Sequence, residues 1–168
     1  GDAAMLRPRR KARLNRFSFK DNYLTGILLA GLFACGLFIS FAYGWPGLVV
    51  YLALWALSYG IIYAGTCRHC AYYGEKCPIP LEGSCVHHFF EKKTEGFGFM
   101  PLFWATLVYG LRAALPVYII FKQAMINMGM VYAAIFLAFW VVHLRFSGCP
   151  NCINTECPLN PDYWVLHP

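Results

Sequence analysis

Four apolar runs, each long enough to cross a bilayer as a helix, dominate the sequence and restrict the folds that it can adopt. A helix spans the hydrocarbon core in about 20 predominantly apolar residues, and the runs cover residues 23–43, 48–65, 99–121 and 126–143. Charged residues make up 13% of the chain, against roughly 25% in soluble domains. We therefore predict an all-α membrane protein with four transmembrane helices.

Short turns group these helices into two hairpins, the first of them closed by GWPG at residues 44–47. The first run is too long for the core of a cleaved signal peptide, and the four residues ahead of Met5 are expected to be left over from an expression tag. We expect five parts: a basic N-terminal segment at residues 1–22, the first hairpin at 23–65, a Cys-rich loop at 66–98, the second hairpin at 99–143 and a Cys-rich tail at 144–168.

The basic residues predict the orientation of the helices. Seven of the fourteen precede the first apolar run, between residues 7 and 20. If the N-terminus is cytoplasmic, the same side also receives Arg68, Lys76, Lys92, Lys93 and Arg145, whereas Lys122 alone lies outside. Lys and Arg are enriched in cytoplasmic loops, so both termini, the loop and the tail are predicted to be cytoplasmic. The net charge of +6 thus reflects membrane flanks, and we expect no nucleic acid partner.

Cysteines concentrate where the second helix of each hairpin ends. Each cluster opens with C-x2-C and continues to a Cys-Pro pair, at Cys77 in the loop and at Cys157 in the tail. This similarity predicts an internal repeat, in which two parallel hairpins are related by an axis along the membrane normal. The two clusters together contain seven of the eight cysteines, Cys67, Cys70, Cys77, Cys85, Cys149, Cys152 and Cys157.

The seven thiols are predicted to bind metal as a set. Cytoplasmic thiols are normally reduced, and two C-x2-C pairs can supply a tetrahedral sulfur site. His69, His87 and His88 are candidate additional ligands. Cys-Pro after clustered cysteines is common at ferredoxin-type sites, which favours one or two iron–sulfur clusters, such as 4Fe–4S. Zinc is the alternative, although Ala71 and Ile153 stand where zinc knuckles usually have glycine.

Further candidate residues lie inside the apolar runs. Arg112 is a costly intramembrane charge, and its two interpretations are a functional group or a side chain paired with a backbone carbonyl freed by Pro116. Aromatic residues recur every four positions, as Tyr51, Trp55, Tyr59 and Tyr63 and as Tyr132, Phe136 and Trp140. Packing explains such stripes, as interfacial placement explains His143. The alternative is contact with a cofactor or quinone at Arg112, His143, Tyr59, Tyr63 and Trp140.

These features predict a membrane-anchored electron-transfer protein. Its partners would be the lipid bilayer, a soluble electron donor or a membrane subunit, and a quinone. The alternatives are a structural zinc-binding interaction protein and a membrane thiol–disulfide oxidoreductase. No acidic residue lies within the four runs, which argues against a carboxylate-based proton pump. Whether the protein is an enzyme stays open, because no catalytic motif can be made out.

Overall fold

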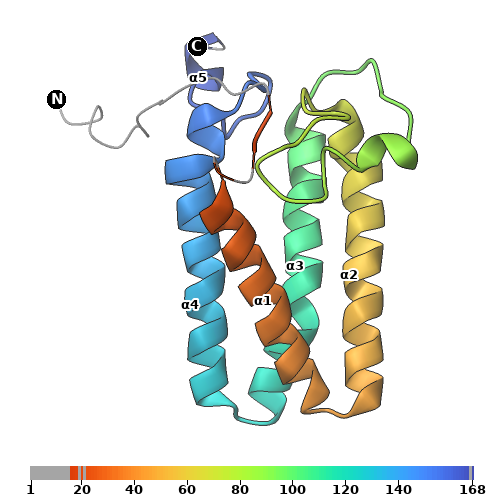
Figure 1. The fold of residues 1–168 in the computed structure, drawn as a ribbon, viewed down its shortest axis with the longest axis vertical. Helices are drawn as coiled ribbons and strands as arrows, with labels where there is room; N and C mark the ends of the chain where they lie inside the picture. Colours follow the sequence, from red (N-terminus) through yellow and green to blue (C-terminus); the bar gives the residue numbers. More distant parts are fainter. Residues whose placement is uncertain (1–15, 19, 21, 167) are drawn as a thin grey trace, which may run out of the picture.

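Four long helices lie side by side in the computed structural model (Figure 1), which describes residues 16–18, 20, 22–166 and 168. Most of the predicted N-terminal segment, 1–22, lies outside the described residues. These residues contain no strand, and an all-helical fold is confirmed. The long helices are α1 (Tyr23–Phe41), α2 (Trp45–Gly65), α3 (Phe99–Lys122) and α4 (Ile126–Val142), and a short α5 (Tyr163–Leu166) follows in the tail.

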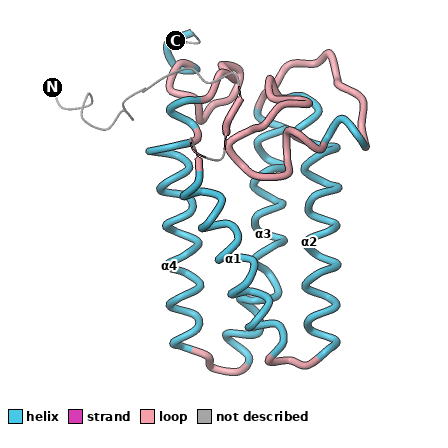
Figure 2. The backbone as a smooth tube through the Cα atoms, in the orientation of Figure 1, coloured by secondary structure: helices cyan, strands magenta, loops and turns pink. Residues whose placement is uncertain are grey.

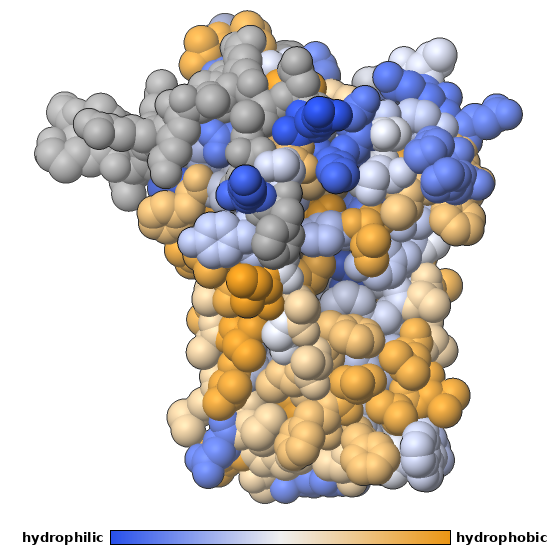
Figure 3. Space-filling model, viewed as in Figure 1, coloured by the Kyte–Doolittle hydropathy of each residue, from blue (hydrophilic) through white to orange (hydrophobic). Residues whose placement is uncertain are grey.

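The surface of the bundle is that of a membrane protein. Each of the four long helical segments is long and apolar enough to cross a bilayer. Large apolar side chains point outward along them, for example Phe121, which is 82% exposed, and Phe38, which is 62% exposed. Figure 3 shows hydrophobic residues around the helical body and hydrophilic residues gathered at the end that bears the loop and tail. The fold therefore indicates a multi-pass membrane protein.

The turn in the first hairpin is shorter than the sequence suggested. Three of the four residues of the predicted turn at 44–47 are helical, because α2 begins at Trp45. Gly44 has φ +86°, a left-handed conformation that glycine adopts without a steric penalty. Pro46 then lies in the first turn of the helix, where its missing N–H leaves no hydrogen bond unmade.

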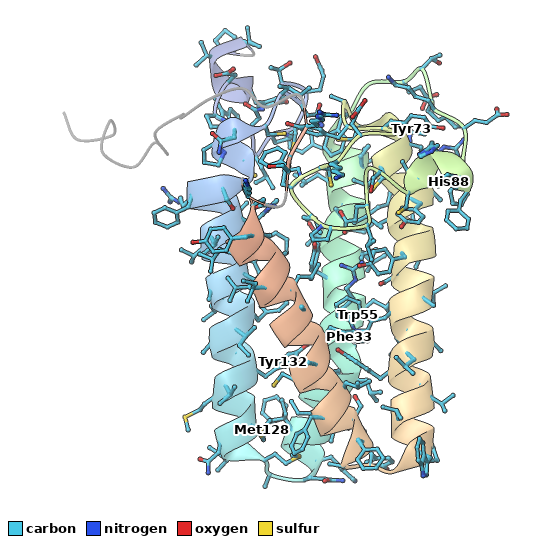
Figure 4. All side chains as sticks on the ribbon, viewed as in Figure 1. Phe33, Trp55, Tyr73, His88, Met128 and Tyr132 are labelled. Carbon is cyan, nitrogen blue, oxygen red and sulfur yellow. The ribbon has the colours of Figure 1, made fainter. Side chains whose placement is uncertain are left out.

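The two hairpins pack chiefly against each other, α2 against α3 and α1 against α4. Large aromatic side chains fill the centre, and Phe33 of α1 lies edge-on to Trp55 of α2 with ring centroids 4.9 Å apart (Figure 4). The buried Tyr51 hydroxyl donates to the Phe33 carbonyl at 3.0 Å. A Cβ at Gly36 would collide with the Tyr51 ring, so glycine at this position lets α1 approach α2.

The loop and the tail meet at one end of the bundle, whereas short turns close the other end (Figure 2). The start of the described chain crosses this end as well. The Phe17 N–H donates to the Lys76 carbonyl at 2.7 Å, and the Phe17 ring contacts Tyr72 edge-on at 5.7 Å. Three segments that are remote in sequence thus form a common layer over the helix ends.

Candidate metal centre

A cavity of about 200 Å³ lies between the loop and the tail, at the ends of α2 and α4. It is lined by six of the seven cysteines that the sequence singled out, Cys67, Cys70 and Cys77 of the loop and Cys149, Cys152 and Cys157 of the tail. We call it the thiol cavity. Long-range folding therefore brings the two clusters to one place, although about 80 residues separate them in sequence.

The two C-x2-C turns have closely similar backbones. Each first cysteine opens a one-turn 3-10 helix, Cys67–His69 in the loop and Cys149–Asn151 in the tail. The N–H of Cys70 donates to the Cys67 carbonyl at 3.2 Å, and the N–H of Cys152 donates to the Cys149 carbonyl at 3.3 Å. Cys70 has φ −85° and ψ 151°, and Cys152 has φ −74° and ψ 138°. Each turn presents both of its thiols to the cavity.

Four of the six sulfurs accept a hydrogen bond from the backbone N–H two residues ahead. The Ile79 N–H donates to Cys77 Sγ and the Asn154 N–H to Cys152 Sγ, each at 3.4 Å. The backbone N–H of Tyr72 bonds Cys70 in the same way, and that of Leu159 bonds Cys157. Hydrogen bonds to sulfur stabilise the thiolate, which is the form that binds metal.

Side chains of the tail also reach the loop. The Asn154 amide donates to Cys70 Sγ at 3.5 Å, and the Ile153 N–H donates to the Tyr72 hydroxyl at 3.1 Å. Asn160, which is 2% exposed, holds the tail with hydrogen bonds from its amide to the Cys152 and Asn154 carbonyls at 2.9 and 3.0 Å. The donor residues are therefore fixed by buried polar contacts.

Burial governs the protonation of the cavity thiols. Loss of hydration raises the pKa of Cys70 to about 12, against the favourable effect of its backbone hydrogen bond. The same cause raises the pKa of Cys157 to about 11 and that of Cys77 well above its usual range. Buried thiols of this kind ionise when a cation compensates the negative charge, and metal binding releases their protons.

The thiols surround a space rather than a single point. Within the described ranges, no three or more His, Cys, Asp and Glu side chains are arranged to hold one metal ion. A mononuclear zinc site needs four ligand atoms within about 2.3 Å of the ion. Thiolate sulfur is the donor that both zinc and iron–sulfur clusters take in proteins, so the lining of the cavity has donors of the right type for either group.

Four of the predicted ligands lie elsewhere. Cys85 packs against Ile62 and Tyr63 and does not line the cavity. His69 Nδ1 is 3.3 Å from the Glu95 carbonyl. The rings of His87 and His88 contact each other at 3.9 Å and are exposed. Figure 4 shows His88 at the outer edge of the loop, away from the tail. These side chains are not brought to the six clustered thiols.

His143 does line the cavity, and it is 9% exposed. A π-type turn, His143–Ser147, continues α4 and is closed by the Gly148 N–H, which donates to the His143 carbonyl at 3.1 Å. The imidazole stacks on Phe139 with centroids 6.0 Å apart, and its Nδ1 has no hydrogen-bond partner. Single π-turns within helices are frequent at functional sites. The structure thus places His143 beside the thiols and buries it, rather than leaving it at the membrane interface.

Sequence reasoning missed Glu82, a buried acid that also lines the cavity. Its carboxylate lies 3.7 Å from the Arg112 guanidinium. Loss of hydration raises the pKa of Glu82 to about 7, and Arg112 opposes this rise. Of the two interpretations of Arg112, the structure does not show the contact with a backbone carbonyl, because its side-chain contacts are with Ser58 Oγ and with Glu82 of the loop. One acidic residue between two cysteines gave no sequence signal for this pairing.

Arg112 is enclosed by aromatic rings. Its guanidinium lies 4.6 Å from the Trp55 ring centroid, 4.5 Å from that of Tyr59 and 5.0 Å from that of Tyr109. Its Nε donates to Ser58 Oγ at 2.8 Å. Cation–π contacts of this kind stabilise a desolvated guanidinium. Arg112 therefore connects the aromatic stripe of α2 to Glu82 at the wall of the thiol cavity.

The aromatic stripe of α2 is continuous. Tyr51, Trp55, Tyr59 and Tyr63 are in successive ring contact, with centroids 6.1, 6.4 and 5.9 Å apart. Tyr63 donates to the Leu81 carbonyl. On α4, Trp140 contacts Phe136 at 6.4 Å and lines the thiol cavity. Both stripes thus lie on one helix face and lead toward the cysteine segments.

Comparisons with protein families, with curated proteins and with solved structures found no match for this chain.

Proposed function

We propose that this protein is an integral membrane metalloprotein that binds a Cys-ligated iron–sulfur centre in the thiol cavity and uses it for electron transfer. The observation that carries the proposal is the convergence of six thiols, from two segments remote in sequence, on one cavity of about 200 Å³. The backbone hydrogen bonds to four of the sulfurs support it, because such bonds tune cluster potentials. When bound, the centre would accept one electron and pass it on, returning to its starting oxidation state.

The four ligands that we propose are the thiols that accept a hydrogen bond from the backbone N–H two residues ahead, namely Cys70, Cys77, Cys152 and Cys157. They are equivalent positions in the two Cys-rich segments, which agrees with a two-fold repeat of the hairpins. Cys67 and Cys149 lie at the ends of the membrane helices and complete the wall. Glu82 and Arg112 contribute opposite charges near this wall. Because Glu82 balances the positive charge of Arg112, Arg112 alone does not compensate the net charge of the bound centre.

We further propose that this end of the protein faces the cytoplasm. The described basic residues Arg68, Lys76, Lys92 and Lys93 belong to the same loop as the cysteines, in agreement with the enrichment of basic residues on the cytoplasmic side. A soluble electron donor or a membrane partner subunit would then reach the loop and tail. An impermeant thiol reagent added to intact cells should leave Cys85 unlabelled. Labelling of Cys85 from outside would show that this end of the protein faces away from the cytoplasm.

The proposal is tested by purifying the protein without oxygen and measuring iron, acid-labile sulfide, zinc, the absorbance spectrum and the EPR spectrum of the reduced form. Iron and sulfide in equal amounts, with visible absorbance that bleaches on reduction, are expected. A Cys35→Ser variant is the matched control, because Cys35 lies in α1 and packs in the apolar core. Colourless protein with stoichiometric zinc would overturn electron transfer and favour a structural zinc cap.

A further inference from the structure

Two hollows on the outer side of the loop lead from the bilayer toward the thiol cavity. The first, which we call the helix groove, has a volume of about 420 Å³ and lies between α1 and α2. Its walls are apolar and aromatic, with Phe33, Trp55 and Tyr59 among them. It lies along the membrane-spanning part of both helices, so its opening is accessible to lipid-soluble molecules.

The second hollow, the headgroup cleft, has a volume of about 410 Å³ and lies under the start of the described chain. It is more polar than the groove, since Asn22, Lys76 and Ser84 are among its lining residues. Gly26, Pro80 and Leu81 line both the cleft and the groove. The two hollows are therefore neighbours that share a wall, and each has the volume typical of a small-molecule site.

The cleft also borders the proposed metal centre. Cys77, Pro78 and Ile79 line both the headgroup cleft and the thiol cavity. One short segment therefore separates the two spaces, and it carries a thiol that we assign as a metal ligand. A molecule in the cleft would be separated from the centre by the width of this segment.

Asn22 supplies a second, independent sign of a ligand. It is 8% exposed and lines the cleft, and its Oδ1 has no hydrogen-bond partner. Although Asn22 precedes the first turn of α1, its side chain does not cap the helix. A buried acceptor without a partner costs about 1–3 kcal/mol. Since Oδ1 itself is buried, a ligand hydroxyl in the cleft would satisfy it once the side chain turns toward the cleft.

We infer that the headgroup cleft and the helix groove together bind a membrane quinol, with its ring and hydroxyls in the cleft and its isoprenoid tail in the groove. This inference rests on the proposed function, to which it adds the electron-exchange partner: two electrons from the soluble donor, passed one at a time through the centre, and two protons from water would convert the bound quinone to the quinol. The groove is apolar and the cleft is more polar, which matches the tail and the polar ring of an amphiphile that enters from the bilayer. We assign a quinol rather than a phospholipid because the segment that carries the proposed ligand Cys77 forms a wall of the cleft.

The site differs from the one that the sequence suggested. Tyr59 lines the helix groove, and of the five predicted contacts it is the one placed there. Arg112 lies behind Trp55 and Tyr59, in contact with their rings. His143 and Trp140 line the thiol cavity instead. The quinol site therefore lies between α1, α2 and the loop.

The test uses a photoreactive azidobenzoquinone with a decyl tail, reduced to its quinol and added to the full-length protein in phosphatidylcholine vesicles. Labelling is mapped by mass spectrometry, and binding is measured by competition with decylubiquinol. We expect labels in the Lys76–Ser84 stretch and in the first half of α1. Labelling that excess phosphatidylethanolamine removes as well as decylubiquinol does would overturn the inference in favour of a lipid.

Two matched pairs of variants sharpen the test. Gly26→Phe should block the junction between the headgroup cleft and the helix groove and abolish the binding for which decylubiquinol competes. Gly31→Phe, in the same helix but outside both hollows, should leave this binding unchanged. Asn22→Leu should weaken quinol binding about fivefold through loss of one hydrogen bond, and Asn22→Asp, which keeps an acceptor oxygen, should weaken it less. Equal effects within each pair would contradict the inference.

Iron and sulfide are measured on the same samples, so failure of the metal centre can be distinguished from failure of the quinol site. Normal iron content without specific labelling removes the quinol site and leaves the metal centre. Specific labelling of protein that contains no iron removes the electron-transfer function and leaves a quinol-binding site. Gly26→Phe should keep its iron, since Gly26 does not line the thiol cavity.

Discussion

The side-chain amide of Asn154 donates a hydrogen bond to the sulfur of Cys70 at 3.5 Å, across 84 positions of sequence. This contact joins the tail to the loop at the proposed metal centre. Asn154 is also 5% exposed, and its carbonyl accepts a hydrogen bond from Asn160 at 3.0 Å. The residue thus supports a proposed ligand from outside the ligand set, in the way that neighbouring hydrogen bonds orient metal ligands.

Asn154→Leu should therefore weaken metal retention without removing a ligand. Loss of a supporting hydrogen bond typically costs about 10–100-fold in metal affinity. The measurement is the rate of iron loss to a chelator under anaerobic conditions, with visible absorbance as the readout. Asn127→Leu, at the start of α4 and far from the cavity lining, is the control. Equal rates in the two variants would show that Asn154 does not support the centre.

How much of this arrangement the sequence could predict depends on the range of the interaction. The four helices follow from local composition, and their observed bounds differ from the predicted ones by a few residues at most. The largest shift, at Trp45, arises because Pro46 is compatible with a first helical turn. A set of seven cysteines that includes the six of the cavity could also be selected, since each cluster directly follows a helix.

The pairing of Glu82 with Arg112 could not be predicted, because it depends on how the loop folds back onto the bundle. The sequence selected Cys85 together with Cys77 as a candidate ligand, yet Cys77 lines the cavity and Cys85 does not. The difference arises from the turn after Cys77, in which Cys77 Sγ accepts the Ile79 N–H at 3.4 Å. The spacing of the cysteines in the sequence does not indicate which of them the folded loop places at the cavity.

The Glu82–Arg112 pair provides a stability prediction. Arg112→Met leaves Glu82 buried without its counter-charge, and breaking a buried pair in this way costs about 3–5 kcal/mol. Glu82→Gln should also destabilise the fold, because it leaves Arg112 enclosed by Trp55 and Tyr59 without an anion. The double variant Glu82→Gln/Arg112→Met should lose less than the sum of the two. Reversible unfolding in detergent measures the cycle, and additive losses would mean that the two side chains do not interact.

Individual cysteine substitutions test the proposed ligand set. Cys70→Ser, Cys77→Ser, Cys152→Ser and Cys157→Ser should each lose most of the bound iron, because serine oxygen is a poor substitute for thiolate at iron. Cys85→Ser should retain iron, as its side chain lies outside the thiol cavity. Iron-to-protein ratios after anaerobic purification give the answer.

The outcome for Cys67 and Cys149 separates two ligand arrangements. Cys67→Ser and Cys149→Ser are compared with Cys70→Ser. If all three lose iron completely, the ligands are the two C-x2-C pairs, and not the four sulfurs that accept a hydrogen bond from the N–H two residues ahead. Retention of iron in both variants, with a shifted EPR signal, supports the proposed set. Loss in Cys85→Ser equal to that in Cys77→Ser would contradict both arrangements.

The π-type turn after α4 gives a final prediction, which concerns Gly148. A Cβ at this position would collide with the His143 ring and carbonyl. Gly148→Ala should therefore displace His143 from the cavity wall and cost about 1–3 kcal/mol, as overpacking does. Gly110→Ala is the matched control, because Gly110 lies within α3 and a Cβ there meets open space. It should stabilise the helix by roughly 0.5–1 kcal/mol. Thermal unfolding measures both effects, and iron content shows whether the displacement of His143 disturbs the metal centre. A Gly148→Ala protein as stable and as iron-loaded as the wild type would show that the π-turn is not required for the centre.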